Sequence, residues 1–159
     1  MGEIARFILF IGPCSSIFDY TTYLIMWFVF ECNNLGLVPP PELAARFAHA
    51  TAANPDSTYA AALFQTGWFV ESLLTQTLII HVIRTNKVPF IQSRASWQLI
   101  MTSAAIMLVG IWLPSSPIGL WLGLVPLPFS FWPLLLVTLL LYVALTQLVK
   151  VWLVRKQWI

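Results

Sequence analysis

FWPLLLVTLLLYVALTQLV, residues 131–149, is a continuous apolar stretch without a charged residue. An α-helix rises about 1.5 Å per residue, so about 20 apolar residues cross the hydrocarbon core of a bilayer. This stretch is long enough to do so as a single helix. It therefore predicts a membrane span near the C-terminus and sets the frame for the rest of the chain.

Three further apolar stretches predict spans at 7–30, 62–83 and 97–113, of which the last is the shortest. Hydrophobic residues make up 59% of the 159 residues and charged residues only 9%, with a mean hydropathy of +0.83. Soluble domains carry about 25% charged residues. The chain has too little polar surface to face water all round. We predict an all-α polytopic membrane protein with four transmembrane helices in a lipid bilayer, and not a soluble enzyme.

The predicted spans are joined by three segments of different character. Residues 31–61 contain Pro39-Pro40-Pro41 and form an outer loop with room for one short surface helix in its alanine-rich part. Residues 84–96 form a basic loop. Residues 114–130 are rich in proline and glycine and uncharged, so we expect this segment to dip into the membrane interface.

The basic residues predict the orientation of the spans. Only Arg46 lies in the loops on one side of the membrane, whereas seven basic residues lie on the other side: Arg6, Arg84, Lys87, Arg94, Lys150, Arg155 and Lys156. The positive-inside rule then places both termini and the 84–96 loop in the cytoplasm. An even number of spans requires the same arrangement. The N-terminus lacks the basic start and the cleavage site of a signal peptide, and we expect a multi-pass protein of the inner (plasma) membrane.

Two acidic residues, Asp19 and Glu71, lie inside the first and second predicted spans. Both fall near the bilayer centre, where a charge costs roughly 2.5–3.5 kcal/mol on insertion scales. The chain has no basic residue at that depth, so any counter-charge must be a proton, a cation or another chain. The residues leave two readings open. Each acid is either a packing group satisfied within the bundle or a group that binds a cation.

Polar residues accompany both acids at helical spacing, three and four positions away. Asp19 shares its stripe with Ser15, Ser16, Thr22 and Tyr23, and the opposite face carries Phe18, Leu24 and Phe28. Glu71 shares its face with Thr75, and Ser72 and Gln76 form an adjacent polar row. These stripes must pack on another helix or line water. Upstream, Pro13 should break or kink the first turns, because proline removes one bond of the helix ladder.

The sequence contains no motif for other chemistry. It has no phosphate-binding glycine loop, no Ser/His/Asp arrangement and no zinc-ligand spacing. His49 and His81 stand apart from other ligand types, and Cys14 and Cys32 are expected to be free thiols. The net charge of +2 is small. We expect neither a cofactor in this chain nor a nucleic-acid partner.

Several runs resemble magnesium-importing P-type ATPases. ARFILFIGPCSSIFD at 5–19 is similar to the start of their seventh transmembrane helix, and LFQTGWFVESLLTQTL at 63–78 is similar to the eighth. Ile91-Gln92-Ser93-Arg94 matches the cytoplasmic loop that follows, and Pro126-Leu127-Pro128 fits the segment before the last span. The resemblance covers nearly the whole chain except the 33–61 loop, which is longer and richer in proline than the family leads us to expect.

This resemblance implies that the chain corresponds to the C-terminal four-helix support region of such a pump. Glu71 matches a carboxylate on the eighth helix that helps to bind the cation in related pumps, so it is a candidate metal ligand with Mg²⁺ as the transported ion. The family's phosphorylated DKTGT aspartate and its nucleotide domain have no counterpart here. ATP hydrolysis by this chain alone is therefore not expected, and the implied partner is the remaining part of a pump or an intact pump. The alternative is a small four-helix membrane protein that binds or regulates a partner pump.

Overall fold

The computed structural model describes residues 2–49, 58–83 and 96–155. Within these ranges the chain forms helices and turns and no strand, which confirms the all-α class there. The four long helices each overlap one of the predicted spans: α1 (Gly2–Leu24), α2 (Tyr59–Ile83), α3 (Trp97–Trp112) and α5 (Phe131–Arg155).

Two stretches of the described residues are long and apolar enough to cross a membrane by length and composition. They are Trp97–Ser115, with a mean hydropathy of 1.5, and Phe131–Leu153, with 2.2. The other two long helices have comparable lengths, 23 residues in α1 and 25 in α2. They carry Asp19 and Glu71 together with many hydroxyl side chains, which lowers their hydropathy. That all four helices cross the membrane remains a prediction.

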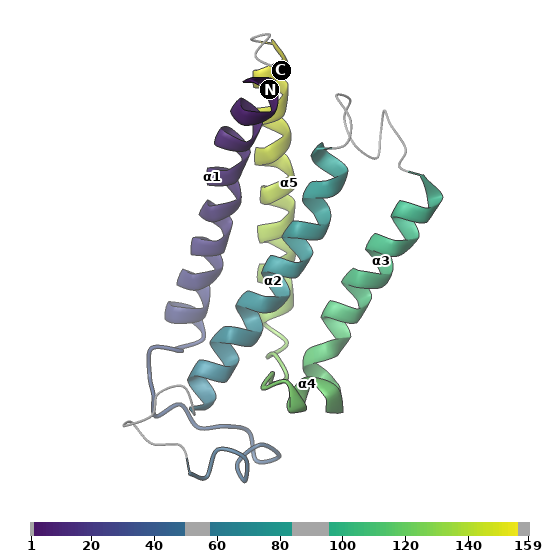
Figure 1. Ribbon diagram of the computed structural model, residues 1–159. Coiled ribbons are helices and arrows are strands. Elements are labelled where there is room, and N and C mark those ends of the chain that lie inside the picture. The colour runs from purple at the N-terminus through teal and green to yellow at the C-terminus, as the bar shows by residue number, and fades with distance from the viewer. Residues whose placement is uncertain (1, 50–57, 84–95, 156–159) are drawn as a thin grey trace.

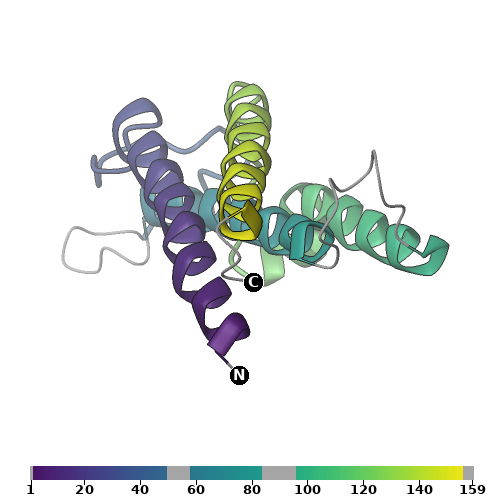
Figure 2. The ribbon, with the colours of Figure 1, turned by 90° about the horizontal axis from the view of Figure 1, so that it is seen from above.

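The four long helices run up and down side by side. The helices α1, α2 and α5 pack against one another, and α3 packs against α2. The first turns of α1 and the last turns of α5 lie at the same end of the bundle (Figure 1). Viewed from above, α3 stands at the edge of the bundle, away from α1 (Figure 2). The bundle thus has a three-helix side and a single-helix side that share α2.

The first helix is irregular at a different place from the predicted one. The predicted break at Pro13 is not found, because α1 runs unbroken through this residue, and the alternative of a kink stays a prediction. Proline removes a single ladder bond, and membrane helices tolerate such a loss. The backbone changes instead at η1 (Ile25–Val29), a π-helical turn that follows α1. Met26 in this turn is fully buried against Gly67 of α2, where a Cβ atom would lie only 2.6 Å from its sulfur.

The uncharged segment between α3 and α5 folds back onto the bundle. It contains η3 (Leu113–Ser115) and the short helix α4 (Pro117–Trp121). Ser116 caps α4 by accepting a 3.0 Å hydrogen bond from a backbone N–H of its first turn. Further on, the backbone N–H of the fully buried Val125 donates a 3.0 Å hydrogen bond to Thr66 Oγ1 on α2. A side chain of α2 thereby fixes the return of this segment.

The two loops at this end of the bundle are joined to each other. The Arg46 guanidinium donates a 3.1 Å hydrogen bond to the carbonyl of Leu124. Cys32 and Leu43 from the first loop are both buried in the apolar core at this end. The loop consists of turns up to residue 49. Most of the predicted 84–96 loop, and residues 50–57 of the predicted outer loop, lie outside the described residues.

Candidate cation-binding site

Glu71 is the most deeply placed acid of the bundle. It lies on α2, its side chain is 0% exposed, and neither of its carboxylate oxygens has a hydrogen-bond partner among the described residues. A buried polar group without a partner costs about 1–3 kcal/mol or more. The fold therefore holds this carboxylate at an energetic cost, which is typical of residues kept for function.

Asp19 on α1 is the nearest acidic neighbour of Glu71. Asp19 and Thr75 are close enough to influence the Glu71 carboxyl group electrostatically, although neither forms a hydrogen bond of normal geometry with its oxygens. Ser72 Oγ donates a 3.3 Å hydrogen bond to Asp19 Oδ1. Thr75 Oγ1 donates a 3.0 Å hydrogen bond to the backbone carbonyl of Glu71, which holds the Thr75 hydroxyl against the turn that carries Glu71. The two acids that the sequence placed at the same depth thus lie together.

A third helix completes this cluster with Tyr142 of α5. The Tyr142 side chain is fully buried, and its hydroxyl lies 3.5 Å from Ser15 Oγ on α1. Phe18 packs edge-on against its ring, with 5.4 Å between centroids. Phe18, on the face of α1 opposite the predicted stripe, is therefore buried against α5. We call the six residues gathered here the polar cluster: Ser15, Asp19, Glu71, Ser72, Thr75 and Tyr142.

The potential metal ligands of the polar cluster are all oxygen atoms. Hard cations such as Mg²⁺ and Ca²⁺ prefer oxygen ligands, and Mg²⁺ typically takes one or two carboxylates and retains several waters. Two neighbouring carboxylates in a low-dielectric site also repel each other unless a proton or a cation lies between them. Among the described residues no three His, Cys, Asp or Glu side chains converge. The cluster can therefore supply at most two carboxylates, and a full cation shell needs further oxygen atoms.

Four residues of the predicted polar stripes stay outside the cluster: Ser16, Thr22, Tyr23 and Gln76. Ser16 is exposed, and its hydroxyl donates 3.4 Å to the carbonyl of Gly12 in the preceding turn. Gln76 is exposed on the surface of α2. Tyr142, in contrast, joins the cluster without having been predicted. The one signal for it in the sequence is a single tyrosine within the long apolar run of the last span.

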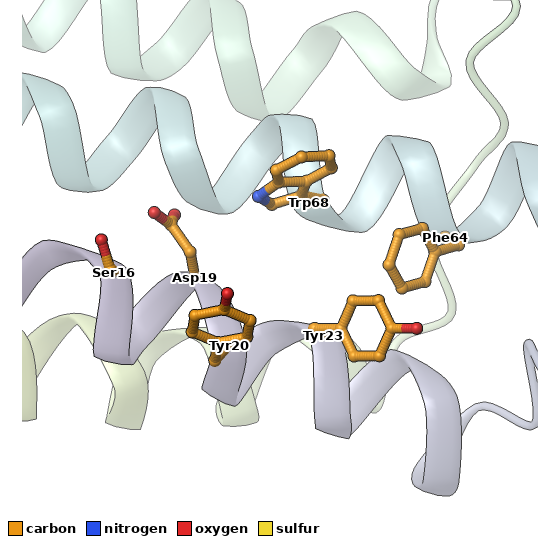
Figure 3. A pocket seen from close by; sticks show the side chains of 6 residues that line it. All are labelled: Ser16, Asp19, Tyr20, Tyr23, Phe64 and Trp68. Carbon is orange, nitrogen blue, oxygen red and sulfur yellow. The ribbon is translucent and has the colours of Figure 1, made fainter.

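A groove of about 340 Å³ lies between α1 and α2, next to the cluster. Figure 3 shows the Asp19 carboxylate pointing from α1 toward α2, with the indole of Trp68 standing on α2 beside it. The groove is lined by two polar and four aromatic side chains: Ser16, Asp19, Tyr20, Tyr23, Phe64 and Trp68. Asp19 therefore faces both the buried Glu71 and the outer surface of the bundle.

Other buried polar groups tie the helices together at the end where α2 finishes. His81 Nε2 lies 3.0 Å from Ser103 Oγ, which joins α2 to α3. The buried Lys150 ammonium of α5 donates a hydrogen bond to the carbonyl of Val82 in the last turn of α2. A cation suits the carbonyl end of a helix. His81, which stands alone in the sequence, is therefore part of a helix–helix contact.

Both cysteines are buried free thiols. In the outer loop, burial raises the pKa of the Cys32 thiol to about 11. Its sulfur donates to the carbonyl of Phe30 at 3.8 Å. The thiol is therefore neutral at physiological pH and has the character of a core residue.

Comparison with known proteins agrees with this architecture. Residues 2–152 match the family described as "Cation transporting ATPase, C-terminus". The magnesium-transporting ATPase, P-type 1, of Salmonella typhimurium is 45% identical over 158 residues, which are 98% of this chain and 15% of that protein. The protein of the same name from Escherichia coli is 46% identical over 149 residues, 94% of this chain and 14% of its own length.

The chain thus spans about 15% of the length of these relatives. The resemblance of its helix and loop motifs to magnesium-importing P-type ATPases is confirmed by these matches. The family match extends from α1 to residue 152 of α5 and includes Asp19, Glu71 and Tyr142, which join α1, α2 and α5 in the polar cluster. The chain belongs to the family of cation-transporting ATPase C-terminal regions.

Proposed function

We propose that this chain is the C-terminal membrane region of a magnesium-translocating ATPase and that it crosses the inner membrane four times with both termini in the cytoplasm. Four long helices of alternating direction support this count. Seven of the eight basic residues fall on the side of the predicted cytoplasmic ends, as the positive-inside rule requires. The remaining part of a pump, which the longer relatives contain, is the partner of this region.

The observation that carries a role in ion transport is the buried carboxylate of Glu71. Its two oxygens have no partner in the described part of the chain, and Asp19 lies beside it. In this proposal Glu71 is a ligand of the transported Mg²⁺ in the membrane. The hydroxyl groups of Thr75 and Tyr142 provide a polar environment next to the Glu71 carboxylate. Water and oxygen atoms from other helices complete the shell.

Energy for transport must come from another part of the pump. The chain carries no phosphate-binding loop and no phosphorylation motif. We therefore assign it no ATP hydrolysis of its own. Its contribution is to position Glu71 at a fixed depth between α1 and α5 and to keep bulk water away from the carboxylate.

A chimeric pump tests this role. The matching C-terminal region of the Escherichia coli magnesium-transporting ATPase is replaced by this chain, and Mg²⁺-dependent ATPase activity and Mg²⁺ uptake are measured in proteoliposomes. We expect Glu71→Gln to raise the Mg²⁺ concentration for half-maximal activity at least about tenfold, because the amide keeps the shape of the side chain and loses its charge. Activation at the unchanged Mg²⁺ concentration would return Glu71 to a packing role.

Glu42→Gln is the matched control for this experiment. Glu42 is an exposed acid in the outer loop, so the same chemical change there should leave activation by Mg²⁺ unaltered. A similar loss in both variants would indicate a general effect of the negative charge on ion concentration at the surface. Such a result would remove the support for Glu71 as a ligand.

One observation favours the second candidate function, a small membrane protein that binds or regulates a partner pump. The groove between α1 and α2 is open and carries an acidic side chain. A partner could be bound there whether or not this chain is joined to a pump. The two functions are distinguished by whether the chain restores transport in the chimera or alters the activity of an intact pump when added to it.

A further inference from the structure

The groove between α1 and α2 exposes an unusual combination of side chains on the outer surface of the bundle. Tyr20 is 70% exposed, Trp68 49% and Tyr23 40%. Tyr20 and Trp68 lie beside the carboxylate of Asp19, and Tyr23 lies farther along the same groove, next to Phe64 (Figure 3). The negative face of an aromatic ring attracts a cation within about 6 Å of its centroid. A carboxylate bordered by exposed rings is therefore suited to a cation with an apolar stem.

Asp19 retains acceptor capacity toward the groove. The hydrogen-bond donor found for it in the described part of the chain is Ser72, at 3.3 Å. An ionised carboxylate has about four lone-pair sites. Its other neighbour, Glu71, is itself an acid. The interior of the bundle therefore leaves part of the charge of Asp19 unbalanced.

Among the residues that the structure describes, no Lys or Arg side chain lines this groove. Between residues 7 and 83 the sequence contains a single Lys or Arg, Arg46. Its guanidinium donates a hydrogen bond to the carbonyl of Leu124. Lys150 of α5 lies at the far end of α2, where it donates a hydrogen bond to the carbonyl of Val82. The described part of the chain therefore places no positive charge beside Asp19.

We propose that the groove binds the ammonium or guanidinium group of a lysine or arginine carried by another transmembrane helix. Depth argues for a helix as the carrier. Asp19 lies near the middle of the predicted span 7–30, at a depth that neither a lipid headgroup nor a water-soluble amine normally reaches. A basic residue at that depth is costly for its own helix, and the groove offers it a carboxylate and aromatic faces. The free-energy cost of the basic residue in its own helix and that of the Asp19 carboxylate both fall when the two helices associate.

Host–guest peptides test the proposal. The full chain, labelled with a donor fluorophore, is reconstituted in lipid nanodiscs with leucine–alanine transmembrane peptides that carry an acceptor and one guest residue at their centre. The guest is lysine or its closest neutral counterpart, methionine. We expect energy transfer to show at least about tenfold tighter association of the lysine peptide. Asp19→Asn should remove this preference, and Tyr20→Leu should weaken it.

Two controls make the result decisive. Trp121→Leu removes an aromatic side chain that is 94% exposed on α4, away from the groove, and should leave the preference intact. Glu42→Gln removes an exposed acid of the outer loop and should also leave the preference intact, which excludes a general effect of negative charge. If Asp19→Asn does not fold, the Tyr20→Leu variant still tests the groove.

Two outcomes would overturn the proposal. Equal association of the lysine and methionine peptides would show that the groove is an apolar surface for lipid chains. Self-association of the chain that displaces both peptides would assign the groove to a second copy.

Discussion

The helix α2 has two faces that are built on different principles. Toward α1 and α5 it presents the acid Glu71 and the hydroxyl groups of Ser72 and Thr75, which meet polar side chains of the other two helices. Toward α3 it presents Phe69 and Leu73, and the groove between these two helices is lined by apolar residues alone. One face is specified by charge and hydrogen bonding and the other by shape. In the proposed function, the face that carries Glu71 is also the face that costs stability.

The packing of the apolar face depends on one close approach between α3 and α2. Gly110 of α3 is buried, and a Cβ atom there would lie 2.3 Å from Leu73 Cδ2. Small residues let membrane helices approach each other in this way, since lipid offers no hydrophobic driving force between them. The polar contact between His81 and Ser103 lies near the end of the same interface. Substitutions on the two faces are therefore expected to change the free energy of unfolding in opposite directions.

The largest expected effect is a gain of stability on the polar face. Glu71→Met replaces a buried carboxylate whose oxygens have no partner by an apolar side chain of similar length. We expect the free energy of unfolding of the chain to rise by roughly 2–3 kcal/mol, because the desolvation cost of the carboxylate disappears. The measurement is SDS-induced unfolding in bicelles, followed by circular dichroism.

Glu42→Met is the control for this substitution, since Glu42 is exposed and should change the unfolding free energy by less than about 0.5 kcal/mol. A fall in stability for Glu71→Met would contradict the comparison. It would mean that Glu71 is satisfied within the bundle and that both faces of α2 contribute to stability in the same sense.

The second effect is a loss of stability on the apolar face. Gly110→Val places a branched side chain where the Cβ alone already overlaps Leu73. We expect a loss of about 1–2 kcal/mol from overpacking, measured by the same unfolding method. Because the clash involves the end of one flexible side chain, Leu73→Ala in the same molecule should restore part of the loss.

Gly12→Val is the matched control, because nothing lies within 4 Å of a Cβ built on Gly12. This variant should change stability much less than Gly110→Val. If the two valine variants change the free energy of unfolding equally, the cause is common to any glycine-to-valine change in a helix and not the contact with Leu73. The shape argument for the α2–α3 face would then fail.

The sequence predicts the helices better than it predicts their contacts. Apolar stretches of span length locate the four long helices, because in lipid the backbone must satisfy its own hydrogen bonds and few structures do so. Periodicity also places Asp19 and Glu71 at one depth. It does not tell which helices meet, so Tyr142 enters the cluster only through the packing of α5 against α1.

The irregular points of the fold were also beyond the reach of sequence patterns. Pro13 is a strong local signal for a broken helix, and yet α1 continues through it. The π-helical turn at Ile25–Val29 contains no proline or glycine to mark it. It accompanies the close contact of Met26 with Gly67, which is a tertiary contact between residues far apart in the sequence.

A smaller effect tests how much a single hydroxyl group matters on the polar face. Tyr142→Phe removes the hydroxyl that lies 3.5 Å from Ser15 Oγ and keeps the ring that packs on Phe18. A bond at this distance is weak. We expect a change in unfolding free energy of no more than about 0.5 kcal/mol in either direction. A loss above about 1.5 kcal/mol would show that this hydroxyl makes a stronger bond than the one to Ser15.

The smallest effect concerns the loop that closes the bundle below both faces of α2. In a Cys14→Ala background, Cys32 is the only thiol, and its thiolate is the species that reacts with iodoacetamide. Burial disfavours the thiolate and raises the pKa of Cys32 to about 11. The alkylation rate should therefore rise about tenfold per pH unit from pH 7 to nearly pH 11, whereas an exposed thiol levels off above its pKa of about 8.5. A plateau near pH 9 would show that the outer loop leaves Cys32 open to water. The close packing between the helices would then not extend into the apolar core of the outer loop around Leu43.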